Sequence, residues 1–318
     1  DPGALRVARQ QLHQAVGALE VVGLAAPAQV LRGMEAAVQR FVQRPLSCTD
    51  EAAGKVERAS FALIEYLEAV LNGKPVPPVA LFSQYREVQE LAGAERVHPA
   101  DLWSFDRRGV EAPAPAGVPP MKVDPQVRSL FDRLVLLVVK TNSRAASTQL
   151  SRMCASLAVG AQQPRAITFW RAAAAYFEGL SQNLIAPDVY AKRAASRILL
   201  QLAGLVQGGA RADVSETLLH DLLFFCAQAR PMPGTPAPHL EAVRAAFGLS
   251  DAAPVDYSQA TLGRFDPALL VQARKRINAG KESWSLLAGG DLGLFFMHLG
   301  NLAAHYLAAD HARQAGFI

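Results

Sequence analysis

The chain has 318 residues, of which 51% are hydrophobic, 7% aromatic and 19% charged, and its formal net charge is +4. At roughly 100–200 residues per domain, this length predicts two or three domains with a sizeable buried core. The small positive charge is dispersed, which argues against a nucleic-acid-binding protein. The longest apolar run, LVLLVV at 134–139, is too short to span a membrane.

Apolar residues recur at spacings of three and four along the whole chain, which predicts an all-α fold. In the N-terminal part this pattern predicts helices at about 5–23, 26–42, 47–71 and 79–91, joined by short loops as in an antiparallel bundle. The stretch EAPAPAGVPP at 111–120 is typical of a semi-rigid spacer. We therefore expect a first helical domain at 1–103 and a linker at 104–123.

A second helical series follows the expected linker. Helices are predicted at about 125–142, 144–160, 164–182, 187–207, 214–229, 238–247, 266–288 and 291–315. The break RPMPGTPAP at 230–238 suggests a second bundle at 124–230 and a further helical segment at 231–318, which is either part of the second domain or the start of a third. Cys48, Cys154 and Cys226 lie far apart in apolar surroundings, which favours reduced thiols in a cytoplasmic protein.

One histidine lies on the polar side of the first predicted helix. The apolar residues of this helix form a single stripe, and His13 lies opposite that stripe with Gln10, Gln14 and Gly17. An exposed imidazole is largely neutral near pH 7, so one of its ring nitrogens can attack a phosphoryl group. A glycine one turn further on leaves the surface bare for an approaching protein. The alternative is an inert, solvated histidine.

The stretch LHQAVGALEVVGL at 12–24 resembles the histidine phosphotransfer (Hpt) family of four-helix bundles. In that family the phosphorylated histidine is followed by a lysine three residues on, a glycine four on and a second glycine ten on. His13, Gly17 and Gly23 match this pattern, and Val16 takes the place of the lysine, whose charge offsets that of the phosphoryl oxygens. The resemblance implies that His13 is the phosphoryl acceptor. The expected contact face for a partner comprises Gln10, Gln14, Gly17, Glu35 and Gln39.

A wider resemblance covers residues 5–93 through LHQAVGALEVVGL, LRGMEAAVQRF and EYLEAVLNGKPVPPVALF. These segments are similar to the N-terminal Hpt-like units of the CheA-type histidine kinases of chemosensory pili systems, ChpA or PilL, and to the related scaffold FimL. DVYAKRAASRILLQLAGL, LLHDLLFFCAQA and GRFDPALLVQARKRI resemble the interior of the same region.

The wider resemblance implies Hpt-like antiparallel bundles in series, in a bacterial cytoplasmic protein that controls type IV pili and twitching motility. The implied partners are CheY-like response-regulator domains, kinase-core domains and other pili signalling proteins. The sequence contains no Walker loop and no ATP-binding kinase core, so the chain is not expected to phosphorylate itself. A piece of a histidine kinase and a non-catalytic helical scaffold both stay open.

The remaining candidates favour structural roles, and we predict neither a cofactor nor a metal site. His298 and His305 are seven residues apart, whereas metal ligands on one helix are more often three or four apart. His220 and Asp221 are more typical of a helix surface than of an active pair. We expect three tryptophans, Trp103, Trp170 and Trp284, to be packing anchors. An alternative is that Trp170 and the aromatic residues near it form part of a groove for a partner helix; these neighbours are Phe169, Tyr176 and Phe177.

Overall fold

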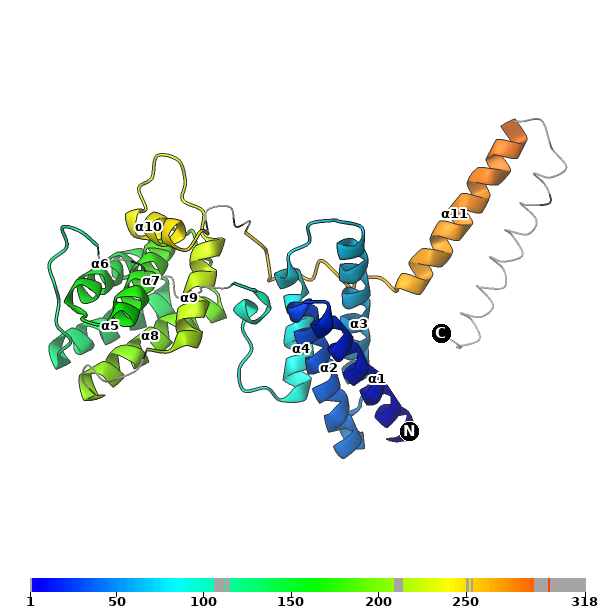
Figure 1. Cartoon of the computed structure of the whole chain (residues 1–318), viewed down its shortest axis with the longest axis horizontal. Coiled ribbons are helices and arrows are strands. Elements are labelled where there is room, and N and C mark those ends of the chain that lie inside the picture. Colours follow the sequence, from blue (N-terminus) through cyan, green and yellow to red (C-terminus); the bar gives the residue numbers. More distant parts are fainter. Residues whose placement is uncertain are drawn as a thin grey trace.

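The computed structural model describes residues 2–105, 112, 115–208, 214–249, 252, 254–288 and 297. This described part is helical and contains no strand, which confirms the predicted all-α class. Two groups of helices lie side by side, α1–α4 and α5–α10, and the long helix α11 projects beyond the first group (Figure 1). The predicted helix at 291–315 lies outside the described residues, apart from Met297.

The four helices predicted in the N-terminal group are all present within a few residues of their expected bounds. Gly23 has the left-handed backbone conformation (φ +79°) that ends the first of them, as its position predicted. Thr49 caps the third by accepting a hydrogen bond from the backbone N–H of Ala52 at 3.2 Å. The helices of this group are α1 (Pro2–Val21), α2 (Ala25–Gln43), α3 (Asp50–Leu71) and α4 (Phe82–Ala92), with short 3₁₀ helices η1 (Pro45–Ser47), η2 (Pro78–Leu81) and η3 (Pro99–Leu102).

Helix α2 is the centre of the first group. It packs against both α1 and α4, and α4 in turn packs against α3. Its buried side chains include Val30, Met34 and Phe41, which are four and seven residues apart as expected for one helix face. Because α1 contributes only one face to this packing, its opposite face stays exposed to solvent.

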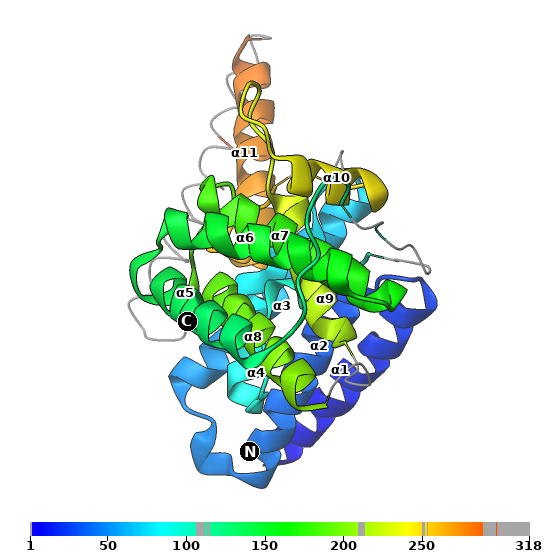
Figure 2. The ribbon, with the colours of Figure 1, turned by 90° about the vertical axis from the view of Figure 1, so that its left-hand side faces the viewer.

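The second group is built around α7, whose side chains are buried along most of its length. Figure 2 shows α6 and α7 lying across the front of this group. Phe169, Trp170, Tyr176 and Phe177 are fully buried, so the predicted aromatic groove is wrong and these rings form the core instead. The helices are α5 (Pro125–Thr141), α6 (Arg144–Gly160), α7 (Pro164–Ser181), α8 (Val189–Gly208), α9 (Glu216–Gln228) and α10 (Pro238–Ala246).

The predicted domain boundaries stay predictions, but two contacts bear on how the second series is built. Helix α10, which follows the proline-rich break at 230–238, packs against α7. The guanidinium of Arg244 donates to the carbonyl oxygens of Cys226 and Ala227, both at 2.8 Å, and so caps the end of α9. These contacts hold the short helix against the bundle that precedes it.

A buried carboxylate connects the two groups of helices. Asp221 on α9 is 0% exposed, and its two oxygens lie 2.7 Å from guanidinium nitrogens of Arg96, which follows α4, and Arg197 on α8. Arg96 also pairs with Asp101. Burial raises the pKa of Asp221, and the two guanidinium groups oppose that rise. The prediction that Asp221 lies on a helix surface is therefore wrong.

His98 lies beside this carboxylate and starts the short helix η3. Its Nδ1 accepts a hydrogen bond from the backbone N–H of Ala100 at 3.1 Å, and the ring meets Phe225 edge to face. The same Nδ1 lies 3.4 Å from Asp221. Burial, reinforced by the positive charges of Arg96 and Arg197, lowers the pKa of His98 from 6.5 to about 3. The folded protein thus keeps this imidazole neutral.

This low pKa predicts a specific loss of stability in acid. As the pH falls below 6.5 the unfolded chain protonates His98 while the folded chain does not, so unfolding is favoured by up to about 1.4 kcal/mol for each pH unit. His98→Asn keeps an acceptor suited to the start of a helix and removes the titration. In chemical denaturation, the advantage of wild type over His98→Asn should shrink between pH 6.5 and 4. A difference that is constant with pH would contradict the assignment.

The segment 254–266 returns from the second group to the first and leads into α11 (Pro267–Ala288). The side-chain amide of Gln84 donates to the carbonyl oxygen of Leu262 at 2.7 Å, and the N–H of Gly263 donates to Glu65 at 3.0 Å. Helix α11 itself makes little contact, and Trp284 on it is 68% exposed, so the prediction of a packing anchor there is wrong. Within the described residues, no helix is long and apolar enough to cross a bilayer.

Candidate functional site

Helix α1 presents His13 to solvent. The side chain of His13 is 74% exposed, whereas Val16, three residues on, is only 6% exposed and belongs to the main core. At about 100° per residue the two side chains lie about 60° apart around the helix axis, so His13 lies just outside the edge of the apolar stripe. The apolar stripe is therefore what turns the imidazole outward.

A carboxylate of the neighbouring helix holds one nitrogen of the ring. Nδ1 of His13 lies 3.2 Å and 3.3 Å from the two carboxylate oxygens of Glu35 on α2, a side chain that is mostly buried. An ionised carboxylate only accepts hydrogen bonds, so the neutral ring donates from Nδ1 and keeps its lone pair on Nε2. The contact thus selects the tautomer whose nucleophilic nitrogen is Nε2.

The residues around His13 leave room for a partner. Gln10 and Gln14 are exposed on the same helix, and Gly17 has no atom within 4 Å of the position that a Cβ would occupy. On α2, Glu35 contacts the imidazole, whereas Gln39 is half-buried one turn further along. The structure therefore brings Glu35 to His13 and leaves an uncovered surface beside the ring.

Charge at this face is carried by arginine. A guanidinium nitrogen of Arg9, one turn before His13, lies 4.0 Å from the Glu35 carboxylate. Arg32 on α2 is paired with Glu20. The helical pattern places Arg9 on the polar side of α1. The sequence does not mark Arg9 as a site residue, because the pattern does not show that Arg9 and His13 contact the same carboxylate.

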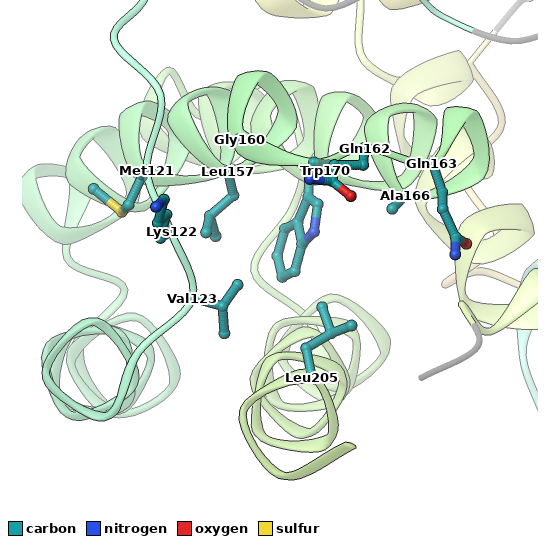
Figure 3. Close-up of a pocket in the computed structure, with 11 residues that line it drawn as sticks. Met121, Lys122, Val123, Leu157, Gly160, Gln162, Gln163, Ala166, Trp170 and Leu205 are labelled. Carbon is teal, nitrogen blue, oxygen red and sulfur yellow. The ribbon is translucent and has the colours of Figure 1, made fainter. Parts of the chain in front are cut away.

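A second feature is a cavity of about 320 Å³ in the other group of helices (Figure 3). The extended segment 118–123 crosses α6, with the N–H of Met121 donating to the carbonyl oxygen of Ser156 at 2.9 Å. Gly160 permits this approach, because a Cβ there would clash with the carbonyl oxygen of Met121. Trp170 and Leu205 point into the space from α7 and α8 (Figure 3). The walls of this cavity are mainly apolar, so they suit contact with apolar groups rather than catalysis.

The structure contains no cluster of three histidine, cysteine or carboxylate side chains suited to a metal ion among the residues it describes. His298 and His305 lie outside those residues. Cys154 and Cys226 are buried and unpaired, and burial raises the pKa of both thiols, to about 12 for Cys226. Neither thiol is poised as a nucleophile.

The second group of helices and its cavity lie in the part of the chain that a protein-family model matches. Residues 118–260 match the family model of the FimL scaffold protein second domain. This scaffold family belongs to pili chemosensory signalling. The FimL-like region covers less than half of the chain and includes α5–α10, while the His13 face lies outside it. Comparisons with curated proteins and with solved structures found no match.

Proposed function

We propose that this protein is a cytoplasmic signalling scaffold of a pili chemosensory system, and that its N-terminal bundle docks a partner domain at His13 and carries a phosphoryl group there. The match of residues 118–260 to the FimL scaffold supports the signalling system. The contact between Nδ1 of His13 and Glu35 supports the chemistry, because it leaves Nε2 with its lone pair on an exposed ring.

The chemical step follows from this arrangement. The Nε2 lone pair attacks the phosphorus of an aspartyl phosphate on a CheY-like response regulator, the P–O bond breaks, and its electron pair stays on the departing aspartate carboxylate. From a kinase core, the γ-phosphoryl group of ATP transfers in the same way and ADP leaves. Glu35 keeps the proton on Nδ1 and stabilises the positive charge that develops on the ring.

The docking surface suits a transient complex. Gln10 and Gln14 offer amide donors and acceptors, and the bare surface at Gly17 lets another backbone approach closely. A response-regulator or kinase-core domain must leave after transfer, and small polar contact areas favour such short-lived encounters.

A second candidate is a scaffold that holds partner proteins without phosphoryl chemistry. Val16 favours it, because this residue stands where the Hpt resemblance implies a lysine and is packed into the core. A valine supplies neither charge nor hydrogen-bond donor to a phosphoryl group. Under this reading the His13 face and the FimL-like region serve only to bind proteins.

Labelling with a kinase core distinguishes the two. The full chain is incubated with the core of a pili chemosensory kinase and radiolabelled ATP, beside His13→Gln and the control Gln11→Ala, an exposed neighbour away from the face. Acid-labile, base-stable label is expected on wild type and the control and should be absent from His13→Gln. If wild type, His13→Gln and Gln11→Ala all stay unlabelled, phosphotransfer is contradicted and the non-catalytic scaffold is supported.

A further inference from the structure

We infer that Arg9 supplies the positive charge that offsets the phosphoryl group on His13, the role that the Hpt resemblance gives to a lysine at position 16. The inference rests on the proposed phosphotransfer. Arg9 is not part of the Hpt pattern of His13, Gly17 and Gly23, and it lies outside residues 118–260, the region that matches the FimL family model.

Arg9 and His13 meet the same carboxylate oxygen. A guanidinium nitrogen of Arg9 lies 4.0 Å from Oε1 of Glu35, and Nδ1 of His13 lies 3.2 Å from that oxygen. Residues four apart on a helix are neighbours, with Cβ atoms about 5–6 Å apart. The side chain of Arg9, which is 45% exposed, therefore lies near the imidazole and can turn toward it.

Phosphorylation makes a cation necessary at this place. A phosphoryl group brings a charge of about −2 and three acceptor oxygens. Here it would be added to a ring whose other nitrogen already contacts the Glu35 carboxylate. Without a nearby cation, the two anions repel each other across the ring. A guanidinium can bind two phosphoryl oxygens at once, which suits it to this role.

Other side chains fit the role less well. Val16 is buried and uncharged. Arg32 is paired with Glu20. Arg6 lies seven residues before His13, roughly 10 Å along the helix axis. Arg9 is thus the cation that the observed contacts place beside the reacting ring.

Phosphoramidate tests this charge without a kinase. The Nε2 lone pair attacks its phosphorus, the P–N bond breaks, and the nitrogen leaves with that electron pair as ammonia after taking up a proton. No bond to Arg9 forms or breaks. Its guanidinium moves from Glu35 toward the transferred oxygens and stabilises their negative charge by charge-assisted hydrogen bonds.

The full-length chain is treated with potassium phosphoramidate, and the rate of phosphohistidine formation is followed by phosphorus NMR. Arg9→Ala should react about tenfold more slowly, as expected for the loss of one charge-assisted hydrogen bond. Arg9→Lys should recover most of the rate, and Arg6→Ala, an exposed arginine on the same helix, should match wild type. The wild-type rate should fall with added salt, and that dependence should be weaker in Arg9→Ala.

Three results would overturn the inference, and they can be distinguished. If wild type is labelled at His13 and Arg9→Ala reacts at the same rate with the same salt dependence, phosphotransfer stands and Arg9 has no part in it. If wild type takes up no more phosphate than His13→Gln, the proposed phosphotransfer fails together with the role of Arg9. Thermal unfolding of Arg9→Ala beside Arg6→Ala shows whether a slower rate comes merely from a loosened helix; a slower rate that follows a lowered melting temperature would also count against the inference.

Discussion

Asp221→Ala is expected to lower the free energy of unfolding by about 3 kcal/mol, which makes it one of the most damaging single changes in the chain. The carboxylate is fully buried and pairs with Arg96 and Arg197. Its removal takes away the carboxylate that both guanidinium groups share in the junction between the two groups of helices, although Arg96 keeps its pair with Asp101. Both arginines are partly exposed and can turn toward water, so the loss stays near the lower limit for a broken buried ion pair.

Chemical denaturation measures this effect. Asp132→Ala is the matched control, because Asp132 is an exposed carboxylate on α5 and its loss should change stability by less than about 0.5 kcal/mol. The midpoint for Asp221→Ala should shift well below those of wild type and the control. Equal midpoints for the two variants would show that the junction does not depend on the buried carboxylate.

Gly263→Ala is expected to cost about 2–3 kcal/mol and to free the segment that leads into α11. Gly263 has a left-handed backbone (φ +70°), and a Cβ there would lie 2.6 Å from the carbonyl oxygen of Arg58 and 2.9 Å from the Cβ of Ala62. The strain and the clash act together, so the segment should lift from α3. The hydrogen bond from Gln84 to Leu262 should then be lost.

Trypsin reports this release directly, because Arg264 follows Gly263. Cleavage after Arg264 should be faster in Gly263→Ala than in wild type, and thermal unfolding should begin earlier. Gly234→Ala is the control: Gly234 also has a left-handed backbone (φ +83°), but no atom lies within 4 Å of its Cβ position. It should lose only about 1 kcal/mol from backbone strain. Equal cleavage rates in the two variants would mean that the close packing on α3 has no part in holding the segment.

The helices were predictable because their signals are local. Thr49, Asp124 and Ser143 each accept a backbone hydrogen bond at the start of a helix, and a proline or a cap residue marks most of the breaks between helices. The same local periodicity placed His13 on the polar side of α1, where the structure has it exposed. Glu35 and Gln39 were expected on the contact face, which stays a prediction, and in the structure the Glu35 carboxylate lies within 3.3 Å of Nδ1 of His13.

The junction between the two groups was not predictable from a single sequence. Arg96, Arg197 and Asp221 are far apart along the chain, and the pattern LLHDLLFF reads equally well as a helix surface. Only the packing of α8 and α9 against the end of the first group shows that Asp221 is buried. For the same reason the sequence does not single out Arg9, because its contact is with a carboxylate of the next helix.

We propose that Glu35 holds Nδ1 of His13 and leaves Nε2 as the nucleophile. Phosphorus and nitrogen NMR of the full chain with ¹⁵N-labelled histidine, recorded after reaction with phosphoramidate, tests it most directly. We predict a single phosphohistidine, at His13, with phosphorus bonded to Nε2 and the proton retained on Nδ1. Phosphorus on Nδ1 of His13, on another histidine or on none would contradict the account.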